Sequence, residues 1–316
     1  YGALHPRPCF VLLSAGLPGP LTFPSAGLKM ILGNEVPSMK YNGHTHTELC
    51  PHGSGQSTAA MIEKAIELGF TDYCITEHAP LPIELLDNYV GPLAGFCESA
   101  LRLEQVEDYF SLAEGLREQF SGRINIHIGF EVDYLPGLER QTRAFLDRYG
   151  PRCDTGILSV HFLTDEQGRL HCGDATPELL AACVAPWLDD PQEIYHRYLT
   201  LVKQSVEAEL GAYAPKRIGH MSLIKRHQDY FHFPEQFDAR NMELVREILL
   251  AIRARGGELD FNLAGMYKPE CNEFYPGMQI AALAAELGVP MVYGSDSHEI
   301  DSIGRGYHLY TGLMRF

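Results

Sequence analysis

A chain of 316 residues with 45% hydrophobic and 21% charged residues can bury a large core without disulfides or a structural metal. Its net charge is −16, and because Arg7, Lys29 and Glu35 are the only charges before residue 39, the remainder carries −17. So acidic a surface argues against general nucleic-acid binding and suits a small, positively charged substrate, although solubility alone would also explain it. No apolar run reaches the ~18–20 residues of a membrane span.

The eight cysteines show no C-x-x-C pair and no spacing of a disulfide framework. Several lie inside apolar runs such as DYCITEH and AACVAPW, as small buried residues do. We therefore expect a reducing, cytoplasmic compartment.

Residues 1–38 differ from the rest of the chain. They are rich in proline, glycine and leucine, follow neither the helical nor the strand period, and lack the positively charged start of a signal peptide. Met39 then opens the stretch MKYNGHTH, which resembles a natural start. We expect residues 1–38 to be a non-core extension, non-native or disordered, with a short ordered cap as the alternative, and residues 39–316 to form a single domain.

From residue 40 onward, short apolar runs alternate with helical patterns. Strands are expected at residues 40–46, 72–78, 124–134, 154–163, 215–224, 258–265 and 289–298. Helices are expected at residues 57–69, 98–121, 138–150, 239–257 and 276–288, with helical segments over 177–211 broken near Pro186 and Pro191. Repeated strand–helix units imply a parallel sheet with buried strands, either a doubly wound open sheet or a barrel.

Residues that can bind metals recur at the carboxyl ends of these expected strands. In chain order they are His44, His46, His52, His78, Glu131, His161, His220, Asp296 and His298. Seven of the 14 histidines belong to this set. Active sites of (β/α) barrels form where side chains from several strand ends converge, so this placement favours the barrel.

Each motif alone is weak evidence. An H-x-H on a strand puts both rings on one face, as a chelate for Zn, Mn or Fe requires, but two polar residues at a strand end would also explain it. His161 or His220 alone is more often a hydrogen-bonded histidine than a ligand. Burying all these donors without partners would be costly, and metal ions remove that cost. Glu77, which precedes His78 on a strand, is expected to support the site, and Cys50 to be a bystander.

Six stretches, taken in order, resemble the PHP (polymerase and histidinol phosphatase) superfamily, and within it the monofunctional histidinol-phosphate phosphatases. They are GHTHTELCPHGSG, ITEHAPLP, IGFEVDYLPG, ILSVHFL, PKRIGHMSLIKR and VYGSDSH. The resemblance covers about residues 39–310. It implies a distorted (β/α)7 barrel that holds three divalent metal ions, Zn, Mn or Fe.

The resemblance also implies how the ligands are shared. One metal would be held by His44, His46, Glu131 and Asp296. A second would be held by Glu131, His161 and His220, with Glu131 bridging. The third would be held by His52, His78 and His298.

The activity that the resemblance implies is metal-dependent hydrolysis of L-histidinol phosphate to L-histidinol and phosphate, a step of histidine biosynthesis. Asp296 and His161 are the candidates for a catalytic role. Lys225 and Arg226 are candidate phosphate clamps, with an exposed basic pair as the plain alternative, and Asn262 is a candidate substrate ligand. The partner would be a small phosphate ester, with neither nucleic acid nor membrane, and the sequence indicates no oligomeric state.

Three other functions remain open from the sequence. A phosphoesterase of the same family could act on another small phosphate or a nucleotide. A nucleic-acid-processing module with the same site, as in polymerase-attached domains, is disfavoured by the −17 charge and the lack of a basic stripe. A metal-binding protein without catalysis is disfavoured because no expected ligand is missing.

Overall fold

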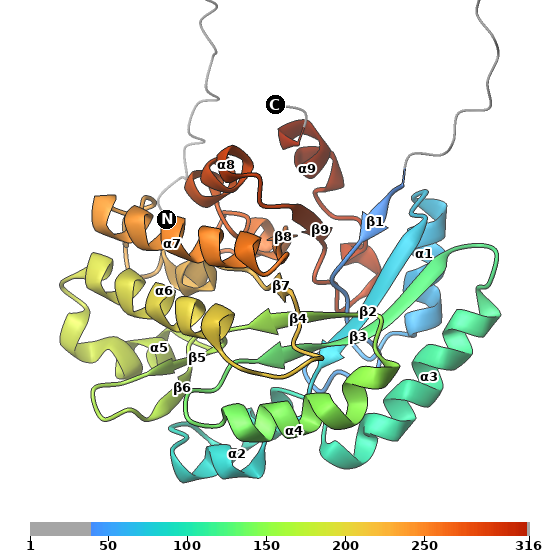
Figure 1. Ribbon diagram of the computed structural model, residues 1–316, viewed down its shortest axis with the longest axis horizontal. Coiled ribbons are helices and arrows are strands. Elements are labelled where there is room, and N and C mark those ends of the chain that lie inside the picture. The colour runs from blue at the N-terminus through green and yellow to red at the C-terminus, as the bar shows by residue number, and fades with distance from the viewer. Residues whose placement is uncertain (1–38, 315–316) are drawn as a thin grey trace, which may run out of the picture. The chain divides into compact units, whose positions relative to one another are not determined.

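The computed structural model describes residues 39–314, so the expected N-terminal extension lies outside the described residues. Seven strands form one parallel sheet (Figure 1). In sheet order they are β1 (Tyr41–Asn42), β2 (Asp72–His78), β3 (Asn125–Asp133), β4 (Thr155–Ser159), β7 (Arg217–Ile218), β8 (Glu258–Asn262) and β9 (Met291–Gly294). The chain order of the strands is thus also their order in the sheet, as repeated βα units require.

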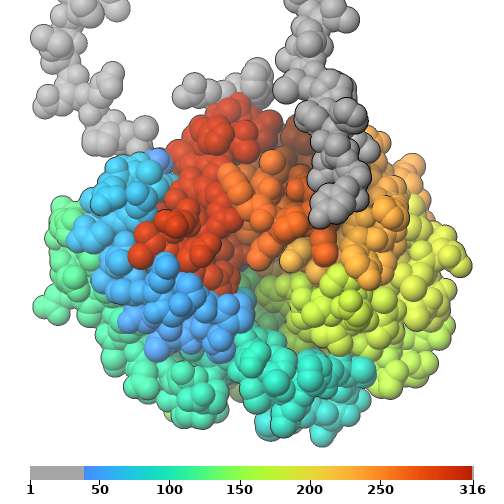
Figure 2. Space-filling view, turned by 180° about the vertical axis from the view of Figure 1, so that it is seen from behind, coloured from blue at the N-terminus to red at the C-terminus, as the bar shows by residue number. Residues whose placement is uncertain are grey.

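The first and last strands of the sheet meet. The backbone N–H of Gly43 donates to the carbonyl of Tyr293 at 2.8 Å, and Thr45 pairs with Ser297 in a parallel bridge. Figure 2 shows the same junction, where the blue first segments lie against the red last ones. The sheet therefore closes, and the predicted distorted (β/α)7 barrel is confirmed over the open doubly wound sheet.

Helices connect the strands and cover the outside of the barrel (Figure 1). The connecting helices are α1 (Thr58–Glu67), α3 (Val106–Gln119), α4 (Glu139–Tyr149), α6 (Pro191–Glu207), α7 (Ala239–Ala254) and α8 (Met278–Leu287). Local chemistry sets their starts: the Asp190 carboxylate accepts the Glu193 N–H at the start of α6, and Asp238 accepts the Asn241 N–H at the start of α7.

Two expected elements are shorter in the structure. The strand expected over 154–163 ends as β4 at Ser159, and β5 (Phe162–Thr164) leaves the barrel to pair antiparallel with β6 (Leu170–Cys172). The helix expected over 98–121 begins only at Val106, as α3, because the chain turns after α2 (Leu93–Glu98) and the Leu101 N–H donates to the carbonyl of His78. The short helices α5 (Pro177–Val184) and α9 (Tyr307–Leu313) complete the chain.

The strands are buried on both faces, as in other parallel sheets covered by helices. All seven residues of β2 are buried, including Glu77 and His78 at its end. A smaller apolar cluster of Leu85, Leu135, Phe162 and Leu170 lies under the β5–β6 hairpin. Within residues 39–314, the cysteines are free and no helix has the length and apolarity that crossing a bilayer requires.

Candidate metal centre

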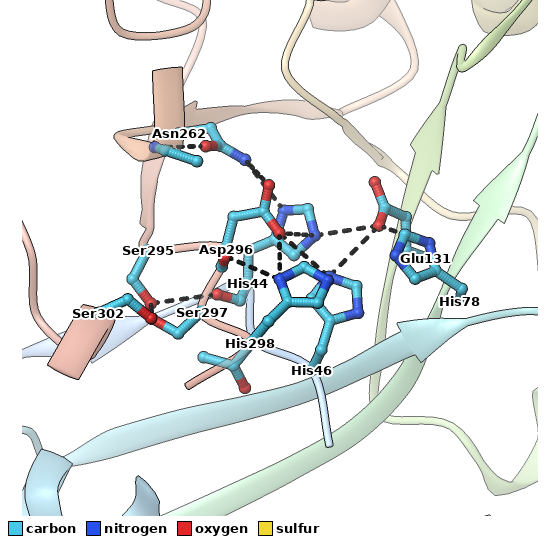
Figure 3. A network of polar contacts seen from close by, with 12 residues as sticks. His44, His46, His78, Glu131, Asn262, Ser295, Asp296, Ser297, His298 and Ser302 are labelled. Carbon is cyan, nitrogen blue, oxygen red and sulfur yellow. Dashed lines mark hydrogen bonds and ion pairs between the residues drawn. The ribbon is translucent and has the colours of Figure 1, made fainter. Parts of the chain in front are cut away.

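The sequence-predicted ligands meet at one end of the barrel (Figure 3). Because all seven strands are parallel, their carboxyl ends share this end. His78 is the last residue of β2, Glu131 lies near the end of β3, and Asp296 lies two residues beyond the end of β9. The predicted ligands, which lie between residues 44 and 298 of the sequence, therefore form one cluster.

Glu131 is the centre of that cluster. Its Oε2 lies 3.2 Å from Nε2 of His44 and 3.2 Å from Nδ1 of His78, and its Oε1 lies 2.8 Å from Nε2 of His220. The Ser159 hydroxyl donates to Oε1 at 2.6 Å. Burial would raise the pKa of Glu131, but the charges of the surrounding histidines hold it well below its usual range, so the carboxylate is ionised and faces ligands on both sides.

The first predicted ligand set comes together. One donor atom each of His44, His46 and Glu131 lie within 4.8 Å of one another, and Oδ1 of Asp296 lies 3.1 Å from Nε2 of His46. Asp296 has a φ of 51°, in the left-handed region, which is uncommon for any residue but glycine. Such strain is typical of functional positions that the surroundings enforce, and here the Asp296 N–H donates to the His44 carbonyl at 2.9 Å.

The second predicted set, Glu131, His161 and His220, also forms one group with donor atoms within 4.8 Å. Nε2 of His161 lies 3.6 Å from Oε1 of Glu131. Nδ1 of His220 is buried and makes no hydrogen bond within the described residues. Glu131 thus belongs to both groups, which is the geometry of a bridging carboxylate.

The third group differs in membership from the expectation. His78 and His298 come together, but the other donors within 4.8 Å are His46 and Cys50. His52 lies beside them, with its ring centroid 4.9 Å from that of His78 and 5.1 Å from that of His298. Its Nδ1 is held by the carbonyl of Glu98 at 2.7 Å, which leaves Nε2 available. The structure therefore offers both His52 and Cys50 at this position.

Three further carboxylates lie behind the histidines and fix their orientation. Asp260 accepts from Nδ1 of His44 at 2.7 Å, Glu77 lies 3.0 Å from Nδ1 of His46, and Asp133 lies 2.8 Å from Nδ1 of His161. In each pair the outer carboxylate fixes Nδ1 as the donor, so the Nε2 lone pair faces the cluster, as in metal sites with carboxylate–histidine pairs.

Asp260 was not predicted as a site residue, although the sequence carries a signal for it. It lies two residues before Asn262 on β8, so both side chains face the same side of the strand. Asn262 donates to Asp260 at 3.0 Å and to Asp296 at 3.2 Å. Glu77, expected in a supporting role, occupies the corresponding position behind His46.

The donor set suits divalent metal ions. Burial and the charge of His46 hold the pKa of His78 well below its usual value and lower that of His298 to about 3, so both rings are neutral, the form that binds metals. Nε2 of both rings is buried without a hydrogen bond in the described part of the chain. Orphaned, neutral imidazole nitrogens beside ionised carboxylates are the ligands that Zn, Mn and Fe prefer.

The two predicted phosphate clamps lie differently. Lys225 is buried, and its ammonium pairs with Glu273 at 2.9 Å and donates to the carbonyl of Glu235. Arg226 is partly buried, with Nη1 3.9 Å from Glu270 and without a hydrogen bond. Neither residue belongs to an exposed basic pair, and their role toward a substrate stays a prediction.

Comparison with known proteins assigns the chain to a family. The PHP domain family matches residues 42–264, and a family described as PHP-associated matches residues 278–311. The histidinol-phosphatase of Bacillus subtilis is 35% identical over 275 residues, which cover 86% of this chain and 98% of that protein.

Two solved structures are similar over most of the chain. One from Listeria monocytogenes, described as a candidate histidinol phosphatase, is 43% identical with a TM-score of 0.83, covering 86% of this chain and 100% of that one. The histidinol phosphate phosphatase of Lactococcus lactis, solved with zinc, L-histidinol and phosphate, is 20% identical with a TM-score of 0.60, covering 87% and 93%, and shares the fold. Because the family match covers most of the chain and relatives align along nearly their whole length, this chain belongs to the PHP domain family.

Proposed function

We propose that this protein is a metal-dependent histidinol-phosphate phosphatase, which hydrolyses L-histidinol phosphate to L-histidinol and phosphate. The observation that carries the proposal is the convergence of the histidine and carboxylate donors at one end of the barrel, in a chain whose relatives at 35% and 43% identity bear this activity in their names. The zinc, L-histidinol and phosphate in the Lactococcus lactis structure are a metal and the two products of that reaction, which supports the same assignment.

The nine predicted ligands would hold three divalent ions, Zn, Mn or Fe. His44, His46, Glu131 and Asp296 would hold one, Glu131, His161 and His220 the second, and His52, His78 and His298 the third. When bound, divalent ions act as Lewis acids on the phosphoryl oxygens and make a nucleophile from water near neutral pH. The attack forms a bond from water oxygen to phosphorus and breaks the bond from phosphorus to the ester oxygen.

In this reaction the attacking water loses a proton and the leaving ester oxygen gains one. The Asp296 carboxylate, 19% exposed, is more open than Glu131, which is 2% exposed. Burial would raise its pKa, but His44 and His46 hold the pKa well below its usual range, so the carboxylate is ionised and can accept a hydrogen bond from the attacking water. Burial would lower the pKa of His161, but Asp133 and Glu131 raise it to about 10, so the ring takes up a proton readily when its Nε2 binds no metal, and only in that state could it protonate the leaving alkoxide.

The test is a phosphate-release assay with L-histidinol phosphate beside a panel of nucleotides and small phosphates, run together with metal analysis of the purified protein. We expect the highest kcat/KM for L-histidinol phosphate, and a loss of at least about 100-fold in kcat for His44→Ala and for Asp296→Ala. His127→Ala is the control, because His127 pairs with Asp72 at the opposite end of the barrel. Unchanged turnover in Asp296→Ala would refute the ligand assignment.

The remaining proposals concern the whole chain. We propose residues 39–316 as one catalytic domain, and a reducing cytoplasmic compartment, which the free cysteines of the described part support. The partner is a small phosphate ester.

A further inference from the structure

Three loops meet beside His161 and His220. The N–H of Gly173, after β6, donates to the carbonyl of His161 at 2.8 Å. Nε2 of His227, in the turn after β7, lies 3.3 Å from the carbonyl of Asp174, and Nδ1 of the same ring lies 2.6 Å from Glu270, in the segment after β8. These bonds hold the residues that follow three different strands against the metal centre.

Asp174 presents a carboxylate at this junction without a basic partner. Among residues 39–314 it forms no ion pair, and its Oδ1 accepts only a weak hydrogen bond from the thiol of Cys172 at 3.3 Å. The residue is half-buried. Since partly buried carboxylates are usually paired or hydrogen-bonded, a free one beside an active site is available to a ligand.

Tyr275 is a second, independent sign of a ligand at the same place. Its side chain is 2% exposed, its ring stands edge-on to His220 with centroids 6.2 Å apart, and its hydroxyl makes no hydrogen bond within the described residues, with the thiol of Cys271 as a polar neighbour. A buried hydroxyl without a partner is costly unless a ligand supplies one.

Charge complementarity identifies the ligand. Arg226 and Asp174 carry opposite charges and lie on either side of one contact, because His227, the residue after Arg226, approaches the Asp174 carbonyl. Within the described residues, Nη1 of Arg226 makes no hydrogen bond, and the Asp174 carboxylate accepts only from the Cys172 thiol. The substrate of the proposed function also carries opposite charges close together, because its ammonium lies two carbons from the ester oxygen that bears the phosphate. The metal centre and Arg226 suit the phosphate, which leaves Asp174 for the positive charge.

We propose that Asp174 determines substrate specificity, by pairing with the ammonium or imidazolium group of a cationic phosphate ester whose phosphate lies at the metal centre. This inference rests on the proposed function, since it names the residue that would bind the cationic group of that substrate. It explains how a site that would bind any phosphate monoester could select one that also carries a cation.

The test compares Asp174→Asn with the unaltered chain on L-histidinol phosphate and on p-nitrophenyl phosphate, which has no cation. We expect kcat/KM for L-histidinol phosphate to fall about 10- to 100-fold, mainly through KM, and that for p-nitrophenyl phosphate to stay within about 2-fold. Asp174→Glu should recover part of the loss. Glu178→Gln is the matched control, because Glu178 is an exposed acid in the first turn of the neighbouring α5.

An equal loss on both esters, or no loss on either, would overturn the inference. Zinc content and the melting temperature of each variant identify a folding defect. If Asp174→Asn has such a defect, Asp174→Glu is used instead, and we expect free L-histidinol to inhibit it more weakly than the unaltered chain; equal inhibition would overturn the inference. If the unaltered chain fails on L-histidinol phosphate, the proposed function is wrong. In that case Asp174 is tested separately, by comparing the kcat/KM of ethanolamine phosphate, which carries an ammonium, with that of glycerol 2-phosphate, which does not. If Asp174→Asn still prefers ethanolamine phosphate as the unaltered chain does, the proposed role of Asp174 is refuted.

Discussion

Asp260 illustrates what a single residue contributes to the centre without facing it. Its carboxylate and the His44 ring are both fully buried, and their 2.7 Å hydrogen bond leaves Nε2 of His44 aimed at Glu131 and Asp296. Oδ2 of Asp260 accepts from both His44 and Asn262, whereas Oδ1 has no partner in the described residues. A buried anion behind an imidazole raises its basicity and therefore its affinity for a metal.

We expect Asp260→Asn to weaken metal binding by about 10- to 100-fold, because the amide keeps the hydrogen bond but loses the charge. Competition of the purified protein with a chromophoric chelator for zinc measures the change. Asp72→Asn is a matched control, since Asp72 makes a similar bond to His127, 3.0 Å long, at the other end of β2. Equal zinc affinities in the two variants would contradict this role.

At the scale of elements, the turn after β7 is fastened to the segment after β8. The Lys225 ammonium pairs with Glu273 at 2.9 Å, and the Gln228 amide donates to the carbonyl of Cys271 at 2.6 Å. With two acceptors already bound, the ammonium of Lys225 stabilises the wall of the site, whereas Arg226 keeps an unbonded Nη1.

Replacing Lys225 by Met should therefore lower stability more than it affects substrate binding. The change leaves the Glu273 carboxylate, 23% exposed, without its cation, and we expect a loss of about 3 kcal/mol in the free energy of unfolding by urea. Lys64→Met is the control, because Lys64 pairs with Glu67 on the surface of α1 and should change stability by less than about 0.5 kcal/mol. A clamp on the phosphate would show the reverse pattern, a raised KM with unchanged stability.

At the scale of the whole molecule, the barrel gathers ionised carboxylates and imidazole rings at one end. Glu131 and Asp296 are ionised there, while Nε2 of His78 and Nε2 of His298 have no partner among residues 39–314. Segments from β1 to β9 supply these groups, so a cation bound among them ties together both halves of the barrel. Binding that favours the folded state raises stability by mass action.

Removing metal with a chelator should accordingly lower the melting temperature by about 10 °C, the effect of about 4 kcal/mol on a domain of this size. Thermal unfolding followed by circular dichroism, with and without the chelator, measures the shift. The His44→Ala variant should shift less because it has lost a ligand. An identical shift in both proteins would mean that the chelator acts elsewhere.

The local sequence was sufficient to predict the barrel and the convergence of most of the candidate ligands at one end of it. Alternating apolar runs and helical patterns predict βα units. In a parallel barrel the carboxyl ends of all strands lie at the same end, so a His or carboxylate at such a strand end is expected there. That rule brings the candidate residues to one face, whereas the resemblance to the PHP superfamily implied their division into the groups of His44, His46 and Glu131 and of Glu131, His161 and His220.

Contacts between distant segments depended on the tertiary structure. Asp260 and His44 are 216 residues apart, and the periodicity of the sequence does not predict which buried carboxylate forms a hydrogen bond with which histidine ring. The burial of Lys225, the β5–β6 hairpin that leaves the barrel, and the approach of Cys50 to His78 and His298 likewise follow from how loops pack. Strand patterns repeat along the chain and can be read locally, whereas loop positions depend on side chains that arrive from elsewhere.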